Sequence, residues 1–530
     1  MDAVVLEERD ANGALASVYY DLGGANTPIA TATSRIAVVA AANDLRARTR
    51  TLPRAARLAQ LLVGVFLPTG YPDSVKPDYT DYQIFDSIQA FASSIAALLG
   101  NRAVLTAVGV GDNTATSTSA LFITVVQETL GRLATITFAW RFGSMLEQEC
   151  KKMRFAADLV NNAALVCDCL APAFLTSQSL KIAFLCASGV LRAVCGVMAN
   201  GSKAALTLHF TNPETGSISD VAAKDSSQET VISLLGMLAG TLIVPYINTS
   251  GETVVALVLL ISVHLWTNYI AVSAVVLDTL NRHRANIVFS AVLDSLSPAM
   301  MESDLASFVA SGVPTSAVPT RRAVARLERI LEWDGALRWG PRGQVMGTAS
   351  FGSFTDVMRM LPPSLGLREL LALFGGVGTA QYVLWYDAVH LRGRRAKHVR
   401  VRIALVDRGH GSDVTSDETY YRHDDGEKSN DRDTRELRAW VHALFLARSA
   451  RNVHGAGAAV SEIAAAKAHE IARAGRFVDA LFAPQRGALG DALAARGWDL
   501  ARGRCMVVSG AVPRVRLRRN SDDGGGGEGM

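Results

Sequence analysis

The chain has 530 residues, of which 49% are hydrophobic and only 19% are charged. Soluble globular proteins carry about 25% charged residues, so this composition argues against a wholly soluble protein, and a net charge of +4 is too small to indicate nucleic-acid binding. Charged residues are dense before about residue 57 and after about residue 302, which makes the middle of the chain the candidate membrane region.

Residues 1–58 are predicted to form an N-terminal cytosolic cap. Short strands are expected at Val4–Leu6 and Ser17–Tyr20, with a turn at Asn12-Gly13 and a basic helical stretch over Ala37–Arg57. The N-terminus is acidic and not apolar, so we expect neither a secretory signal nor a transit peptide. Membrane insertion would therefore depend on internal segments.

The next segment has the most distinctive pattern in the chain. Leu67–Phe91 reads LPTGYPDSVKPDYTDYQIFDSIQAF, and the prolines in its first half are incompatible with a regular helix there. We predict a stiff loop whose tyrosines lie at the bilayer interface and which enters an apolar helix capped by Asp86. The candidate residues of this signature loop are Gly70, Tyr71, Pro72, Asp78, Tyr79, Tyr82, Gln83 and Asp86.

Residues 59–300 are predicted to form a membrane helical core of four to seven helices. The strongest pair is Thr230–Gly251 and Thr253–Leu277, each uncharged and long enough to cross a hydrocarbon core of about 30 Å. Pro245 and the turn that starts at Asn248 end the first span, so the pair predicts a transmembrane hairpin. Weaker spans precede it, at Ser87–Leu99, Ala103–Val126, Leu130–Trp140, Ala156–Phe174 and Ile182–Met198.

Charged residues interrupt the weaker spans, and an ionised group at mid-bilayer costs roughly 2.5–3.5 kcal/mol or more. We therefore expect these helices to pack against one another or to line a polar interior. Glu128 and Arg132 are spaced to pair on one helix face, and Asp112 and Asp158 are further candidates. Two interpretations stay open: a paired network that fixes helix packing, and a path for a substrate or a proton.

A polar run precedes the hairpin. Asp220 and Lys224 attract each other at i, i+4 spacing, whereas Asp225 and Glu229 repel. Ser226 with Glu229 fits a capping box. We expect a capped interfacial helix here, with a polar gate or a partner-docking surface as the alternative.

His264 lies inside the second span of the hairpin, one turn before Asn268. A buried pair with satisfied hydrogen bonds is the favoured interpretation, and a ligand site is the alternative.

Beyond residue 300 the sequence is typical of a soluble domain. We expect a linker and helix over 301–345, a soluble α+β domain over 346–520 and a disordered tail over 521–530. Its expected elements are helices at Arg321–Leu337, Thr434–Ser449 and Val460–Phe482, and strands at Gln381–His390, His398–Asp407, Met506–Val508 and Val512–Leu517. The expected fold class is mainly α, a multi-helix membrane-embedded bundle followed by a smaller soluble α+β C-terminal domain.

Catalytic and metal-binding motifs are not found. The sequence contains no H-E-x-x-H, Walker A or G-x-S-x-G motif, and its six cysteines include no C-x-x-C pair. We expect no enzyme activity, no metal and no cofactor. The basic run from Arg392 to Arg402 lacks interleaved aromatic residues, so we expect a solvated face, with anionic lipid as the alternative and no nucleic-acid partner.

Several stretches of the chain resemble the root UVB sensitive family. Besides Leu67–Phe91, they are VGVGDNTAT (Val108–Thr116), FAW (Phe138–Trp140), KMRFAADLVNN (Lys152–Asn162), KAALTLH (Lys203–His209), DVAAKDSSQET (Asp220–Thr230) and HLWTNYIAV (His264–Val272). Their order and spacing agree across roughly Val4–Arg284. The chain departs from the family pattern at Ala134-Thr135, Met153, Phe210–Asn212 and Ile270, where the family tends to have Gly-Arg, Trp, basic residues and Arg.

The resemblance implies a membrane-associated protein linked to ultraviolet-B tolerance, vitamin B6 homeostasis and auxin transport, in a family in which two members act as a pair. It implies no established reaction. We expect an integral membrane scaffold or adaptor, of no indicated organelle, whose partners are the lipid bilayer and a second family member in a hetero-oligomer.

The alternative is a small-molecule transporter, with a vitamin B6 compound as its possible ligand. A faint likeness of Gly131–Leu146 to the helix-linking loop of major facilitator transporters favours it. A transporter predicts that Asp112, Glu128, Asp158 and Lys224 converge on one cavity, whereas sealed and paired charges favour the scaffold.

Overall fold

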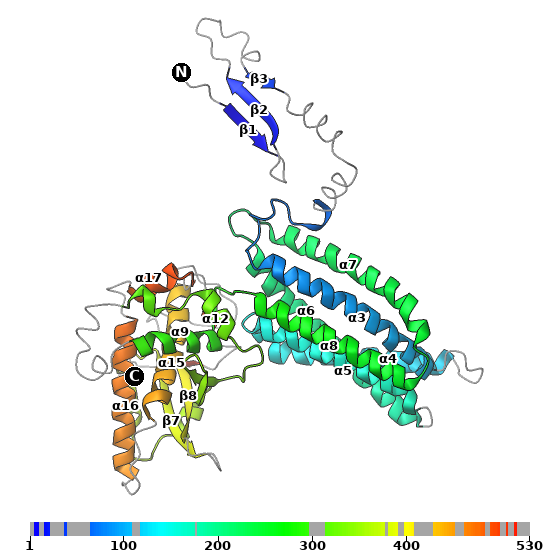
Figure 1. Ribbon diagram of the computed structural model, residues 1–530. Coiled ribbons are helices and arrows are strands. Elements are labelled where there is room, and N and C mark those ends of the chain that lie inside the picture. Colours follow the sequence, from blue (N-terminus) through cyan, green and yellow to red (C-terminus); the bar gives the residue numbers. More distant parts are fainter. Residues whose placement is uncertain are drawn as a thin grey trace, which may run out of the picture. The chain divides into compact units, whose positions relative to one another are not determined.

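The computed structural model describes residues 5–9, 15–21, 36–39, 64–108, 117–174, 177–295, 313–376, 380–390, 397–407, 428–450, 460–482, 488–498, 505–506 and 514–516. The chain divides into two compact units (Figure 1). The helical unit comprises Met1–Trp140 and Met153–Val275, and the C-terminal unit comprises Arg141–Lys152 and Val276–Met530.

A small antiparallel sheet lies near the N-terminus. Strands β1 (Val5–Arg9), β2 (Leu15–Asp21) and β3 (Ile36–Val39) pair in that order. The first two agree with the predicted strands. The third begins where a basic helical stretch was expected, because Ile36 and the two valines that follow are β-branched and favour a strand.

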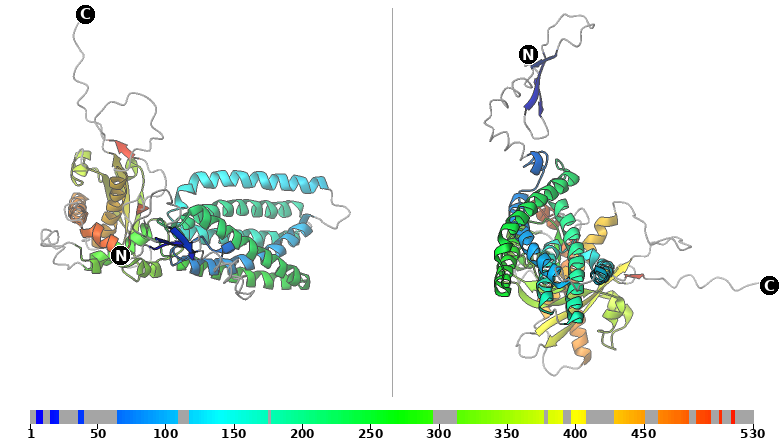
Figure 2. Two further views of the ribbon diagram at one scale, coloured as in Figure 1. Left: turned by 90° about the horizontal axis from the view of Figure 1, so that it is seen from above. Right: turned by 90° about the vertical axis from the view of Figure 1, so that its right-hand side faces the viewer.

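Among the described residues, six long helices form the bundle of the helical unit, and they lie side by side in Figures 1 and 2. They are α3 (Tyr79–Val108), α4 (Ser117–Phe142), α5 (Cys150–Leu170), α6 (Gln178–Phe210), α7 (Ile218–Ile243) and α8 (Ser250–Ala274). Short 3-10 turns follow α4 (Gly143–Met145), α5 (Ala171–Phe174) and α7 (Val244–Tyr246). Helix α3 packs against both α7 and α8.

Two glycines on α7 allow its close approach to α3. A Cβ atom at Gly236 would lie 2.7 Å from the carbonyl oxygen of Phe91, and one at Gly240 would lie 2.5 Å from Leu98 Cδ1. Small residues four apart let two helices bring their backbones together, as in membrane helix pairs. The sequence Gly-x-x-x-Gly therefore positions α7 on the helix that carries Tyr82, Asp86 and Gln89 of the polar network described below.

The two helices of the predicted hairpin are present, with different ends. Helix α7 already starts at Ile218, after Ser217, so Ser226 and Glu229 lie inside it and the predicted capping box there is wrong. A capping box is found instead at the start of α8, where the Thr249 hydroxyl accepts from the Glu252 amide and the Glu252 carboxylate accepts from the Thr249 amide. Thr249 belongs to the turn that was expected to end the first span.

The C-terminal unit is built on a mixed sheet. Its strand order is β10 (Arg514–Arg516), β8 (Lys397–Asp407), β6 (Gln344–Phe351) and β5 (Ala336–Trp339), with β7 (Tyr382–His390) also paired to β8. A separate two-stranded pair joins β4 (Leu280–Asn281) to β9 (Cys505–Met506). The helices in the described part of this unit are α9 (Arg282–Ser295), α12 (Arg321–Leu327), α13 (Phe354–Met358), α14 (Leu367–Ala372), α15 (Lys428–Ser449), α16 (Val460–Leu481) and α17 (Ala488–Ala495), with a 3-10 turn at Thr315–Ala317.

The core of this unit includes α9, which the sequence had placed in the membrane region. Phe289 and Val288 are fully buried in one cluster with Trp440 of α15 and Tyr386 of β7. The C-terminal unit thus resumes at Val276 and not at residue 301. The helix predicted over Arg321–Leu337 is shorter than expected, because α12 ends at Leu327. The last two residues of the predicted range, Ala336 and Leu337, lie in strand β5.

Candidate functional site: a buried polar network in the helical unit

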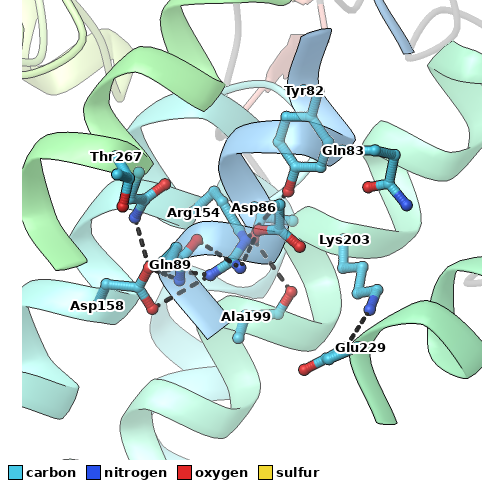
Figure 3. A network of polar contacts seen from close by, with 12 residues as sticks. Tyr82, Gln83, Asp86, Gln89, Arg154, Asp158, Ala199, Lys203, Glu229 and Thr267 are labelled. Atoms are coloured by element: carbon cyan, nitrogen blue, oxygen red, sulfur yellow. Dashed lines mark hydrogen bonds and ion pairs between the residues drawn. The ribbon is translucent and has the colours of Figure 1, made fainter. Parts of the chain in front are cut away.

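Polar side chains of α3, α5 and α8 meet inside the bundle (Figure 3). The network consists of Tyr82, Asp86 and Gln89 on α3, Arg154, Asp158 and Asn162 on α5, and His264 and Asn268 on α8. Tyr82, Asp86, Gln89, Asp158, Asn162, His264 and Asn268 are buried. Charges of this kind are rarely buried unless they are paired.

Arg154 is the centre of this network. Its Nη2 donates to Asp86 Oδ1 at 2.9 Å, its Nη1 donates to Asp158 Oδ1 at 3.2 Å, and its Nε donates to the Tyr82 hydroxyl at 3.3 Å. Every guanidinium nitrogen is therefore bonded. Two carboxylates share this one cation, and a guanidinium with fixed donors, here 12% exposed, suits such double pairing.

Asp158 links the three helices. It accepts hydrogen bonds from the side-chain amides of Gln89 on α3 and Asn268 on α8, in addition to those from Arg154. The Asn268 amide donates through its nitrogen, but its Oδ1 atom is buried without a hydrogen-bond partner among the described residues. A buried unpaired carbonyl oxygen is costly and needs an explanation.

His264 on α8 also lies close to Asp158, with its Nε2 atom 3.7 Å from Asp158 Oδ2. The Gln89 side-chain nitrogen lies 3.2 Å from His264 Nε2, and because this amide group can only donate, Nε2 is the acceptor. The proton is then on Nδ1, which donates to Asn162 Oδ1 at 3.1 Å. The expected His264–Asn268 pair does not form directly, since each side chain bonds to other residues of the network.

A second cluster joins α3, α6 and α7. The Gln83 side-chain nitrogen donates to Asp225 Oδ1 at 2.7 Å, and Lys203 Nζ lies 2.8 Å from Asp225 and 2.6 Å from Glu229. Figure 3 shows Lys203 facing Glu229. Asp225 and Glu229 were expected to repel, and the ammonium of Lys203 from the neighbouring helix bridges them. Lys224 is not part of this cluster, because it donates to the Gly64 carbonyl oxygen.

The signature loop leads into the N-terminal end of α3. Gly70 has a φ of +77°, which favours glycine, and it precedes Tyr71 and Pro72 in a turn. The Tyr71 hydroxyl bonds to Thr80. Asp78 Oδ2 lies 2.9 Å from His209 Nε2 on α6, which ties the start of α3 to that helix.

Two expectations for this loop are wrong. Tyr79 and Tyr82 do not face the bilayer interface: both are buried, with their rings 5.6 and 5.1 Å from the ring of Phe210. Asp86 does not cap α3, which begins at Tyr79, because the Asp86 carboxylate pairs with Arg154 in the middle of the bundle.

The remaining candidates lie elsewhere. Glu128 and Arg132 do pair, at 3.3 Å, but their side chains are 62% and 80% exposed on α4. Gly131–Leu146, which resembles a transporter loop, lies mostly within α4. Asp112 is outside the described residues. Of the four charges expected to converge in a transporter, the three described ones therefore have separate partners.

Arg154 and Lys203 were missing from the sequence-based list of site residues. Arg154 and Asp158 have the i, i+4 spacing of an attractive pair, which is a local signal that would have identified them. No local signal identifies Lys203, because its partners are on another helix. Among the described residues, no group of three histidine, cysteine or carboxylate side chains is placed to hold a metal ion.

Comparison with known proteins identifies the family of this bundle. Residues 53–295 match a family model described as a vitamin B6 photo-protection and homoeostasis domain. Protein root UVB sensitive 3 of Arabidopsis thaliana is 31% identical over 333 residues, which cover 62% of this chain and 68% of the relative. The chain belongs to the root UVB sensitive family. Every residue of the buried network lies within the matched segment.

Other relatives match over a smaller share of their length. RUS family member 1 of Dictyostelium discoideum is 39% identical over 242 residues, which is 45% of each chain, so the match spans less than half of that relative. Protein root UVB sensitive 2, chloroplastic, of Arabidopsis thaliana is 24% identical over 234 residues, which cover 44% of this chain and 52% of the relative. No solved structure matches the chain.

Proposed function

We propose that this chain is an integral membrane protein whose helical unit lies in the lipid bilayer. Four described helices are long and apolar enough to cross a membrane: Tyr79–Val108, Gln178–Phe210, Ile218–Tyr246 and Ser250–Ala274. A span of about 20 apolar residues suffices for the hydrocarbon core.

The observation that carries this proposal is the distribution of side chains. The outward faces are apolar, with exposed leucines at Leu234, Leu238 and Leu242 on α7 and an exposed Trp266 on α8, whereas Asp86 and Asp158 are buried inside. A soluble protein of this size has the opposite arrangement, and large exposed apolar surfaces indicate contact with lipid or protein.

Alkaline carbonate extraction tests the membrane assignment. Membranes that contain the full-length chain are washed at high pH, which strips peripheral proteins and leaves spanning proteins in the pellet. We expect the chain to stay in the pellet and to leave it only with detergent. Release into the carbonate supernatant would contradict the proposal.

Within the membrane, we propose a scaffold or adaptor role in vitamin B6 homeostasis and the ultraviolet-B response. The pairing of charges between the helices supports it: Arg154 bonds to the buried Asp86 and Asp158, and Lys203 bonds to the buried Asp225 and to Glu229, whose side chain is 53% exposed. Such cross-helix pairs fix helix packing in lipid. The C-terminal unit would then be the part that docks a partner, and a second member of the family is the partner we propose.

Transport of a small molecule is the second candidate function. It is favoured by the unpaired Oδ1 atom of Asn268 and by the two carboxylates that share Arg154, since both leave the network able to accept one more hydrogen-bond donor or cation. A vitamin B6 compound is the ligand class that the family description suggests.

Uptake into proteoliposomes separates the two functions. The scaffold predicts no uptake of labelled pyridoxal above protein-free vesicles, with the fold of the reconstituted protein verified by circular dichroism. The transporter predicts saturable uptake that Asp158→Asn abolishes and Glu128→Gln leaves unchanged, because Glu128 lies outside the network. Uptake that responds equally to both substitutions would contradict a route through Asp158.

A further inference from the structure

The C-terminal unit contains a cavity of about 200 Å³ that the buried network does not involve. It lies between the start of β7, helices α15 and α16, and the turn that follows α14. The lining residues are Leu373, Phe374, Gly375, Gln381, Tyr382, Arg438, Gly475 and Asp479. All of them lie outside the segment that matches the family domain.

Two opposite charges line this cavity without pairing. Arg438 is held in place by Gln381 Oε1 at 3.4 Å, by the Phe482 carbonyl oxygen at 3.3 Å and by the Phe482 ring, 5.6 Å away. Asp479 makes no hydrogen bond or direct ion pair with the described residues. Burial raises the pKa of its carboxyl group, and the charge of Arg438 opposes this shift, so the two groups attract each other without touching. A carboxylate and a guanidinium that line one cavity without a direct ion pair between them are able to bind a ligand that carries both complementary groups.

The aromatic wall of the cavity is rigid. The rings of Phe374 and Tyr382 meet edge to face at 5.6 Å. The Tyr382 hydroxyl donates to His442 Nδ1 at 3.0 Å, because His442 Nε2 donates to the Ile471 carbonyl oxygen. A Cβ atom at Gly475 would lie 3.2 Å from His442 Cε1, so this glycine gives the histidine its space. A wall that is fixed before binding lowers the entropic cost of binding.

The size of the cavity limits the ligand. At about 30 Å³ for each water molecule, the volume equals roughly seven waters, and it is smaller than the roughly 300–1,000 Å³ of pockets for drug-sized ligands. We propose that this cavity binds a small single-ring zwitterion, whose anionic group contacts Arg438, whose cationic group contacts Asp479 and whose ring packs on Phe374 and Tyr382.

Binding of 4-(aminomethyl)benzoate tests this proposal, with benzoate and benzylamine as probes that carry one charge each. Isothermal titration uses the full-length chain in detergent. We expect the zwitterion to bind saturably and at least tenfold more tightly than either single-charge probe. Arg438→Gln is expected to weaken the binding of the zwitterion and of benzoate at least tenfold. Asp479→Asn is expected to weaken the binding of the zwitterion and of benzylamine but not that of benzoate.

Arg476→Gln is the matched control, because Arg476 is an exposed residue of α16 that does not line the cavity. Asp479 is also exposed, so Asp479→Asn keeps the test valid if the Arg438 variant fails to fold. No saturable binding of the zwitterion, or equal affinity in Asp479→Asn and Arg476→Gln, would overturn the proposal. It does not depend on the membrane assignment or on a scaffold role.

Discussion

The guanidinium of Arg154 donates a 2.9 Å hydrogen bond to the carboxylate of Asp86, which lies 68 residues earlier on helix α3. The same guanidinium bonds to Asp158, one turn along its own helix. This pairing brings α3 and α5 together through charges inside an apolar bundle. Since unpaired charges there are very costly, the pairing specifies which faces of the two helices meet.

Removing this cation is expected to destabilise the helical unit strongly. Arg154→Gln leaves two buried carboxylates without their partner, and breaking a buried ion pair in this way costs about 3–5 kcal/mol. Thermal unfolding of the full-length chain in detergent, followed by circular dichroism, measures the effect.

Arg132→Gln is the control for Arg154→Gln, because it removes an arginine from an exposed i, i+4 pair on α4. Such a pair is worth about 0.3–0.5 kcal/mol, so the unfolding midpoint should barely change. Equal shifts in the two variants would show that the Arg154 network adds no more stability than an exposed ion pair.

The contact between α7 and α3 provides a second prediction. Gly236→Ala places a methyl group against the Phe91 carbonyl oxygen, which belongs to the backbone and cannot rotate away. We expect a loss of about 1–3 kcal/mol from overpacking. Gly196→Ala on α6 has open space around its Cβ position, so the same change there should be neutral or stabilising by about 1 kcal/mol. A stable Gly236→Ala protein would refute the close helix approach.

Part of this bundle is predictable from the sequence and part is not. The α7–α8 hairpin follows from hydropathy because each span is a continuous apolar run. The start of α3 was misplaced at Asp86, since a carboxylate before an apolar run also fits a helix cap, and only its contact with Arg154 shows its role. Lys203 has no signal in its own segment, because its partners Asp225 and Glu229 belong to α7.

In the C-terminal unit, too, the elements with a local sequence pattern were predictable and those that depend on distant contacts were not. Strands β7 and β8 and helices α15 and α16 lie close to their predicted positions, because their patterns are local. Helix α9 was assigned to the membrane region since Arg282–Ser295 follows an apolar span directly. Its burial against Trp440, far along the chain, places it in the C-terminal unit.

The buried histidine of the C-terminal unit makes stability depend on pH. Burial lowers the pKa of His442 to about 4, although the hydrogen bond to the Ile471 carbonyl oxygen opposes this shift. The unfolded chain has a histidine pKa near 6.5. Because the unfolded state binds the proton first, His442 should cause stability to fall as the pH drops from about 6.5 to about 4, and should have no effect above that window.

Urea unfolding of the full-length chain between pH 7.5 and 4.5 measures this dependence. His442→Asn should reduce the slope of stability against pH, whatever its effect on stability at pH 7.5. His469→Asn changes an exposed histidine of α16 and should leave the slope as it is. An unchanged slope in the His442 variant would contradict a neutral buried histidine.

The central claim is that the apolar outer face of the bundle lies in lipid, and Trp266 tests it most directly. Its side chain is 65% exposed on α8, whereas Trp333 of the C-terminal unit is 75% exposed. Tryptophan fluorescence is measured in vesicles whose acyl chains carry bromine, which quenches only tryptophans in contact with lipid. We predict quenching of the full-length chain that Trp266→Phe reduces and Trp333→Phe leaves unchanged. Absence of quenching, or quenching that does not depend on Trp266, would contradict the claim.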